Sequence, residues 1–206
     1  MRTQAGEYSY FWLRRFHSVV SVVFIFAFLF LYVMPLSSVF GGKAAFNRCM
    51  EVVNSFPMIS FLEIAFVMIP LLIHTAFAFF SMYGSSINIV KYNSYRNWVY
   101  TIRRLSGILL VPFVAYHVFA TTVKFAFTGK YIDFSYMHAL LSSTGIKAFY
   151  AVGIACAIFY MTSGIVSLAF EWGVTVSRKS RDIVSIMMWC IAIALFAWSM
   201  RIILAF

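Results

Sequence analysis

Five long apolar blocks limit most strongly what this chain can fold into. They lie at about 16–36, 59–83, 105–127, 146–170 and 183–206, so each is 21 to 25 residues long. At a rise of about 1.5 Å per residue, an α-helix of that length crosses a hydrocarbon core of about 30 Å with some tilt. The sequence therefore predicts an all-α integral membrane bundle of five transmembrane helices, with residues 1–206 forming a single transmembrane domain.

The composition excludes the main alternatives to a membrane protein. Charged residues make up 11% of the chain, against roughly 25% in an ordinary soluble domain. Aromatic residues make up 20%, which is the opposite of the composition of disordered chains. The net charge of +10 raises the question of nucleic acid, but the basic residues lie in short clusters between apolar blocks. That pattern is typical of membrane topology, and no nucleic-acid partner is predicted.

The basic residues also predict the orientation of the chain. One side, made of the N-terminal arm and the second and fourth loops, carries ten: Arg2, Arg14, Arg15, Lys91, Arg96, Arg103, Arg104, Arg178, Lys179 and Arg181. The other side carries six: Lys43, Arg48, Lys124, Lys130, Lys147 and Arg201. Because short cytoplasmic segments are enriched in Lys and Arg, the N-terminus is predicted to be cytoplasmic and the C-terminus external. The expected location is the cytoplasmic (inner) membrane, crossed several times.

The motifs of soluble enzymes are missing from the sequence. Cys49, Cys156 and Cys190 form no C-x-x-C pair and lie in different segments, so they indicate no disulfide framework and no zinc or iron–sulfur site. The chain also contains no Gly-rich phosphate loop, no G-x-S-x-G and no paired carboxylates. These features predict a chain without a catalytic centre of its own.

Two histidines lie well inside the predicted spans. A polar side chain at that depth is costly and indicates either a functional site or an interhelical hydrogen bond. Counted from the inner ends of their blocks, His74 and Tyr160 lie at about 14 and 15 Å, whereas His117 and Tyr32 lie at about 20 and 24 Å. The count predicts two levels in the bundle, each pairing one histidine with one tyrosine.

With these residues the chain resembles the cytochrome b558 membrane-anchor subunits of succinate dehydrogenases and fumarate reductases, in the form where one five-helix polypeptide carries two haems. The matching stretches follow one another over nearly the whole chain. They are residues 14–18 (RRFHS), 62–64 (LEI), 70–74 (PLLIH), 95–98 (YRNW), 104–108 (RLSGI), 116–118 (YHV) and 172–175 (WGVT).

The resemblance implies a haem site at each of the two levels. Four histidines on the first four helices of that family hold two b-type haems (heme b), and His74 and His117 match two of these iron ligands. Tyr32 and Tyr160 stand where the other two ligands are expected. Because tyrosine can ligate haem iron, three outcomes stay open. Each haem keeps a histidine with a tyrosine or an open position, or one haem is held by His74 and His117 together, or the bundle is haem-free and filled by aromatic side chains.

Four other residues are candidates for roles around such a site. Arg15 and Arg104, each in a pair of arginines, suit carboxylates through bidentate hydrogen bonds and are expected to contact haem propionates or to dock the soluble subunits. His17 is either an interfacial residue or a contact to a propionate or a partner. Glu63, near the outer start of a span, either exchanges protons with a quinone or lies in the headgroup region.

The resemblance implies a function as the membrane-anchor and cytochrome b subunit of a succinate:quinone oxidoreductase. Such a subunit is not itself catalytic. It docks a flavoprotein and an iron–sulfur subunit at the cytoplasmic face, lies among membrane lipid, and passes electrons to a quinone, with menaquinone favoured. The alternatives are a cytochrome b subunit of another membrane dehydrogenase, a haem-free anchor, and a small transporter or assembly protein. The scarcity of intramembrane charges counts against a transporter.

Overall fold

The computed structural model describes residues 11–13, 15–20, 32–56, 58–83, 87–129 and 131–206, and every regular element in these ranges is helical. Residues 11–13 and 15–20 are helical. The elements that follow are α2 (Met34–Leu36), η2 (Ser37–Gly41), α3 (Gly42–Ser55), α4 (Ile59–Glu63), η3 (Ile64–Met68), α5 (Ile69–Tyr83), α6 (Tyr95–Val118), η4 (Phe119–Val123), α7 (Lys124–Thr128), α8 (Phe134–Leu140), α9 (Thr144–Glu171) and α10 (Arg178–Ala205). The element η2 is a 3₁₀ turn, whereas η3 and η4 are π-helical turns.

Within the described ranges, four helical segments are long and apolar enough to cross a membrane. They are Phe61–Tyr83, Tyr95–Val123, Thr144–Glu171 and Arg178–Ala205, and they correspond to the second to fifth apolar blocks. The first predicted span, 16–36, includes residues 21–31, which lie outside the described residues. The prediction of an all-helical, membrane-integral protein is therefore confirmed. The span at 16–36, which would bring the number of spans to five, and the orientation of the termini stay predictions.

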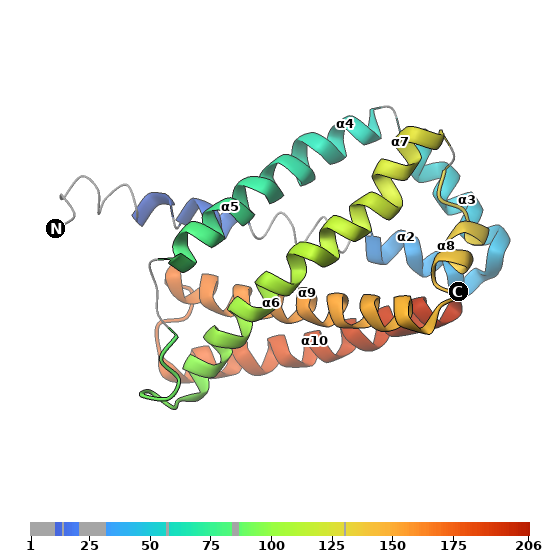
Figure 1. The fold of residues 1–206 in the computed structure, drawn as a ribbon. Helices are drawn as coiled ribbons and strands as arrows, with labels where there is room; N and C mark the ends of the chain where they lie inside the picture. The colour runs from blue at the N-terminus through green and yellow to red at the C-terminus, as the bar shows by residue number, and fades with distance from the viewer. Residues whose placement is uncertain (1–10, 14, 21–31, 57, 84–86, 130) are drawn as a thin grey trace.

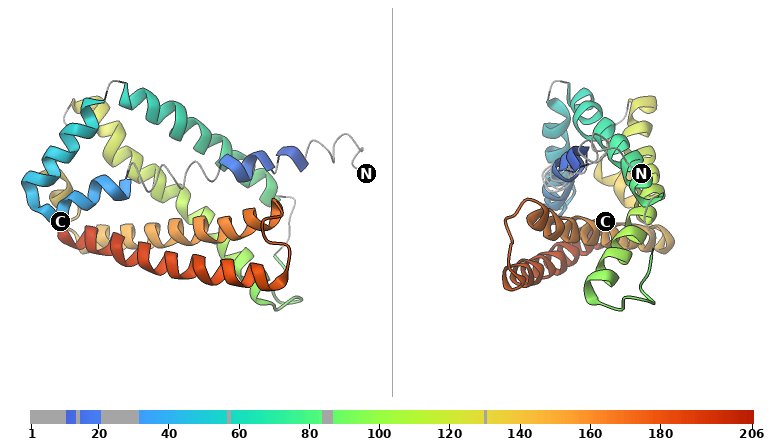
Figure 2. Two further views of the ribbon diagram at one scale, coloured as in Figure 1. Left: turned by 180° about the vertical axis from the view of Figure 1, so that it is seen from behind. Right: turned by 90° about the vertical axis from the view of Figure 1, so that its left-hand side faces the viewer.

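The long helices run between two ends of the bundle. Helix α9 packs against both α6 and α10, and α9 and α10 lie side by side in every view, with α4, η3 and α5 forming the opposite side of the bundle (Figures 1 and 2). We call the end where α5 and α9 end and α6 and α10 begin the basic end, because Lys91, Arg96, Arg178 and Lys179 lie there. At the other end, α3 and α8 lie near the C-terminal residue (Figure 1).

Helix α6 begins ten residues before the apolar block that predicted it. Ser94 is its N-cap, with extended backbone angles and a side-chain oxygen that accepts a hydrogen bond from the Asn97 backbone N–H. The expected start near Leu105 was wrong because hydropathy marks where lipid contact begins, whereas a polar capped turn continues the helix into the headgroup region. Arg103 and Arg104 consequently lie in the third turn of α6 instead of opening a helix.

The cap at Ser94 gives a testable contribution to stability. Ser94→Ala removes the acceptor for an N-terminal backbone N–H, and we expect a loss of about 1 kcal/mol in the free energy of unfolding. Ser143→Ala is the matched control, because Ser143 is the N-cap of α9 but makes no side-chain cap hydrogen bond. Denaturant titration of the two variants in detergent measures the difference. Equal losses would contradict the capping role of Ser94.

Two of the predicted loops contain helices that cover the end opposite the basic end. Helices α3 and α8 lie in the first and third loops, and the Phe46 side chain of α3 is fully buried. Its ring packs edge-on against Phe134 of α8 and against Phe206, with ring centroids 6.2 and 5.1 Å apart. Asn47 accepts a hydrogen bond from the Phe134 backbone N–H at 2.9 Å. These contacts hold the two short helices together as a cap over this end.

The π-helical turns interrupt the second and third spans close to the histidines. The turn η3 (Ile64–Met68) ends six residues before His74, and η4 (Phe119–Val123) begins two residues after His117. Pro70 provides a cause for η3, since a proline ring clashes with the carbonyl of residue i−4, here Phe66, which lies inside the turn. Such π turns are frequent at functional sites, so both spans are irregular near the candidate residues.

Candidate functional site

The first group of candidate residues, the His74 cluster, joins α5, α9 and the N-terminal segment. This segment consists of the described residues 11–13 and 15–20. His74 is 8% exposed, and its Nε2 lies 3.3 Å from the Tyr160 hydroxyl oxygen. The His17 ring stacks on the His74 ring, with centroids 4.0 Å apart and an interplanar angle of 12°. Phe77 packs against the His17 ring at 4.9 Å between centroids. The structure thus brings together His74 and Tyr160, which the depth count placed at one level, and adds His17.

The second group, the His117 cluster, lies between α6, α9 and the residues before α2. His117 Nδ1 is 3.4 Å from the hydroxyl oxygen of Tyr150, whose side chain is buried. The Tyr32 ring meets the His117 ring edge-on at 5.7 Å between centroids. Phe113 stacks on His117 at 6.1 Å. The structure therefore places Tyr32 beside His117, as the depth count expects, but gives the hydrogen bond to Tyr150.

Tyr150 is the residue of this cluster that the sequence prediction missed. Counted from the observed start of α6 at Tyr95, His117 lies 22 residues along the helix, or about 33 Å. Tyr150 lies 21 residues from the end of α9 at Glu171, or about 32 Å. The two residues are therefore level once the Ser94 cap is recognised as the start of α6. The count from the inner end of the 105–127 block placed His117 too close to the membrane face, so the match was missed.

The spacing of the two clusters argues against a haem shared between them. Tyr160 and Tyr150, which hold His74 and His117, are ten residues apart on α9, or about 15 Å. Two ligands on opposite sides of one metal ion at metal–nitrogen distances of about 2.0 to 2.1 Å have donor atoms about 4 Å apart. His74 and His117 each hold a tyrosine at a separate level, so this arrangement does not bring them onto one iron.

The contacts within each cluster also do not fit a haem between the paired side chains. Donor atoms 3.3 and 3.4 Å apart are in direct hydrogen-bond contact, closer than the roughly 4 Å between two donor atoms on opposite sides of one metal ion. Two glycines, Gly107 on α6 and Gly153 on α9, lie directly against aromatic side chains of this chain. A Cβ at Gly107 would lie 3.0 Å from Tyr160 Cε2, and one at Gly153 only 2.1 Å from Phe113 Cδ2. In this arrangement the histidines serve as interhelical hydrogen-bond partners.

Arg15 and Arg104 both bind carbonyl groups at the ends of helices. Arg15 donates from Nη2 to the Glu171 carbonyl oxygen at 3.2 Å, and Glu171 is the last residue of α9. Arg104 donates to the carbonyl oxygen of Met82, in the last turn of α5, at 3.0 Å. Cations suit these positions because the C-terminal end of a helix carries partial negative charge. Both arginines thus have a structural role, and contacts to propionates or partner subunits stay predictions.

The surroundings of Arg15 connect the N-terminal segment to the end of α9. Its guanidinium carbon lies 4.8 Å from the ring centroid of Phe11 and 4.9 Å from that of Trp172. Trp172 Nε1 also donates a hydrogen bond to Ser18 Oγ at 3.1 Å. These contacts fasten Phe11, Arg15 and Ser18 to Trp172 at the end of α9, which holds His17 next to His74.

Glu63 lies near the start of the span Phe61–Tyr83. It is half-buried and is the last residue of α4, directly before the π-helical turn η3. Its carboxylate is close enough to Tyr32 for a Coulombic interaction, and Tyr32 contacts His117. The structure thus connects Glu63 electrostatically to the second cluster, and its proton exchange with a quinone stays a prediction.

Comparison with known proteins identifies the family to which the chain belongs. Residues 86–198 match the family model described as "Succinate dehydrogenase/Fumarate reductase transmembrane subunit". The chain is 31% identical over 196 residues to the "Succinate dehydrogenase cytochrome b558 subunit" of Bacillus subtilis (strain 168), covering 95% of this chain and 96% of that protein. No solved structure matches the chain. Since the similarity to the Bacillus subunit extends over almost the whole of both proteins, the chain belongs to the succinate dehydrogenase/fumarate reductase transmembrane subunit family.

Proposed function

We propose that this chain anchors a succinate dehydrogenase or fumarate reductase complex in the membrane and delivers its electrons to a quinone. The observation that carries the proposal is the similarity to the Bacillus cytochrome b558 subunit over 95% of the chain. Four apolar helices of membrane-spanning length support the anchor role. A flavoprotein and an iron–sulfur subunit are the partners in this proposal, and menaquinone is the favoured quinone.

The basic end is the proposed docking face for the soluble subunits. Lys91, Arg96, Arg178 and Lys179 are exposed there. A surplus of Lys and Arg next to spans is typical of the cytoplasmic side, and a basic surface attracts acidic partner surfaces and raises association rates. In this orientation the ends of α5 and α9 and the starts of α6 and α10 face the cytoplasm.

The anchor role in this proposal does not depend on haem. His74 and His117 are each held by a tyrosine hydroxyl, and this favours the haem-free anchor over the cytochrome. We therefore assign His74 and Tyr160 and, at the second level, His117 and Tyr150 to helix–helix packing. In this proposal, electrons do not pass to the quinone through a haem bound between these pairs.

Copurification tests the partners and the docking face. The tagged full-length chain, extracted in mild detergent from its native membrane, is expected to carry a flavoprotein and an iron–sulfur subunit and to reduce quinone with succinate. In the double variant Lys91→Glu/Arg178→Glu, recovery of the soluble subunits should fall at least about tenfold, because like charges facing each other across an interface cost several kcal/mol.

The matched control reverses two charges at the other end of the bundle. Lys43 and Arg48 are exposed on α3, and Lys43→Glu/Arg48→Glu should leave recovery of the soluble subunits unchanged. If neither a flavoprotein nor an iron–sulfur subunit accompanies the unaltered chain, the proposed function is wrong. If both double variants lose the partners equally, the basic end is not the docking face.

A further inference from the structure

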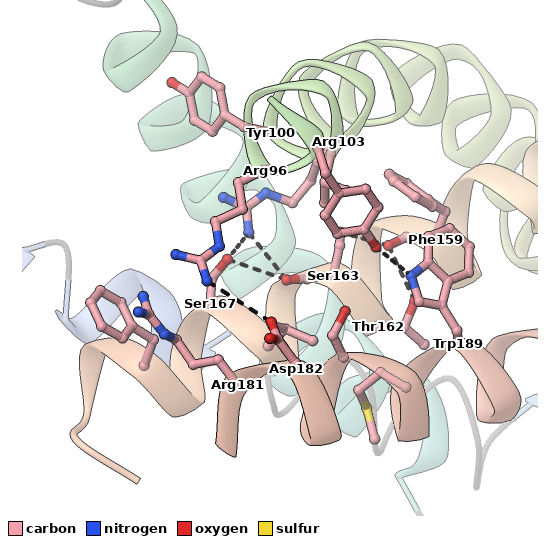
Figure 3. A pocket seen from close by; sticks show the side chains of 16 residues that line it. Arg96, Tyr100, Arg103, Phe159, Thr162, Ser163, Ser167, Arg181, Asp182 and Trp189 are labelled. Carbon is pink, nitrogen blue, oxygen red and sulfur yellow. Dashed lines mark hydrogen bonds and ion pairs between the residues drawn. The ribbon is translucent and has the colours of Figure 1, made fainter. Parts of the chain in front are cut away.

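A cavity of about 220 Å³ lies at the basic end, between α6, α9 and α10. Its wall contains three arginine side chains, from Arg96 and Arg103 on α6 and from Arg181 on α10, but a single carboxylate, that of Asp182. Figure 3 shows the three guanidinium groups gathered at one end of the pocket. The guanidinium end of the pocket therefore carries more positive charge than the one carboxylate in its wall neutralises.

The existing contacts hold the three guanidinium groups without neutralising them. Arg103 donates from Nη1 to the Ser163 carbonyl oxygen at 3.3 Å and to Ser167 Oγ at 2.5 Å, both uncharged acceptors. Arg96 Nη2 is 3.9 Å from Asp182 Oδ1, and the two side chains are 56% and 60% exposed. An exposed ion pair at that distance contributes little.

Arg181 has the least compensated charge of the three. Its guanidinium carbon lies 4.5 Å from the Phe170 ring centroid. Its Nε is buried and has no hydrogen-bond partner among the residues that the structure describes. A buried donor without an acceptor costs about 1–3 kcal/mol, so an anionic ligand that accepts a hydrogen bond from Arg181 would be stabilised here.

The other end of the pocket is apolar and aromatic. Phe159 and Trp189 line it, with ring centroids 5.6 Å apart, and Figure 3 shows them away from the guanidinium groups. Phe159 lies 11 residues before Phe170 on α9, and Trp189 lies eight residues after Arg181 on α10. Counted along these helices, Phe159 lies about 16 Å deeper in the bundle than Phe170, and Trp189 lies about 12 Å deeper than Arg181.

We propose that this pocket binds an anionic phospholipid. The phosphate group lies against Arg181 and Arg103, with Arg96 at the rim, and the first methylenes of an acyl chain lie along Phe159 and Trp189. Arginine forks match phosphate oxygens bidentately. The order of charge and apolar surface along α9 and α10 is that of a lipid in a bilayer. A quinone headgroup carries no charge for three arginines, and an acidic segment of a partner would not need the aromatic end.

Native mass spectrometry of the full-length chain in mild detergent tests the proposal. The probes are phosphatidylglycerol and phosphatidylcholine with the same acyl chains. We expect phosphatidylglycerol to bind at least about tenfold more tightly, and Arg181→Gln to remove about tenfold of that affinity, as for the loss of one charge-assisted hydrogen bond. Arg181→Lys keeps the charge without the bidentate fork and should lose less affinity than Arg181→Gln. Lys179→Gln removes the same charge two residues away, outside the pocket, and should leave the affinity for phosphatidylglycerol unchanged.

Four results would overturn the lipid site. Equal binding of the two lipids would show that the phosphate charge is not recognised. Equal losses in Arg181→Gln and Lys179→Gln would reduce the effect to general surface charge. Displacement of phosphatidylglycerol by millimolar inorganic phosphate would identify a site for a free anion. Finally, unchanged lipid binding in Arg181→Gln together with lower recovery of the soluble subunits would assign the arginines to a protein partner.

Discussion

Under the proposed haem-free anchor, Tyr160→His is expected to give this chain a b-type haem. Tyr160 faces His74 across the bundle with 3.3 Å between the hydroxyl oxygen and Nε2, and in the family that the chain resembles a histidine stands at this position. The substitution creates two imidazoles from α5 and α9 in place of a hydrogen-bonded pair, and exchanges a phenol for a smaller ring beside Gly107. We expect haem content to rise from near zero to about one haem per chain, with two histidine ligands.

A pyridine haemochrome assay and a reduced-minus-oxidised spectrum of the purified complex provide the measurement. Tyr160→Phe removes the same hydroxyl without adding a ligand and should stay free of haem. His74→Ala, combined with Tyr160→His, should abolish the new spectrum. Haem already present in the unaltered complex at one or two per chain would contradict the assignment of the histidine–tyrosine pairs to helix packing.

Gly153→Leu is expected to disrupt the packing of α6 against α9. A Cβ at Gly153 would lie 2.1 Å from Phe113 Cδ2 and 2.3 Å from Cγ, so the buried Phe113 ring has no space to remain where it is. Overpacking of this kind costs roughly 3 kcal/mol or more. Since Phe113 also stacks on His117, the second cluster should lose its arrangement as well. A fall in the midpoint of thermal unfolding in detergent measures the loss.

Gly164 on the same helix provides the matched control. A Cβ at this position would meet nothing within 4 Å, and leucine in place of glycine inside a helix gains up to about 1 kcal/mol of helix propensity. Gly164→Leu should therefore keep or slightly raise the unfolding midpoint. If both leucine variants unfold at the same temperature, the close approach of Phe113 to Gly153 does not determine how α6 and α9 pack.

The long apolar helices could be predicted from the sequence, whereas the short ones could not. Lipid requires a minimum length of apolar chain, and four of the five blocks correspond to the helices of membrane-spanning length. Helix α3 belongs to no such block, and its packing includes the Phe46 side chain, which lies between Phe134 and Phe206. The partners of Phe46 are 88 and 160 residues away in the sequence, so no local pattern shows this contact.

The candidate site shows the same division between local and long-range information. Depth along the spans was enough to pair His74 with Tyr160, because both lie in uninterrupted helix that ends at the basic end. Depth could not show that His17 stacks on His74, since that contact depends on how the N-terminal segment is fastened to the end of α9. Arg15, placed by sequence among candidate ligand contacts, provides part of that attachment.

The attachment of Arg15 to Glu171 has a consequence for how the protein is made. Its two ends are 156 residues apart in the chain, and the bond from Trp172 to Ser18 connects the same two segments. At about 5–20 residues per second, the ribosome needs roughly 8 to 30 s between synthesising one partner and the other. During that time the first segment cannot make these two contacts, because Glu171 and Trp172 have not yet been synthesised. The contacts that fasten Arg15 and Ser18 therefore form only after α9 has been synthesised.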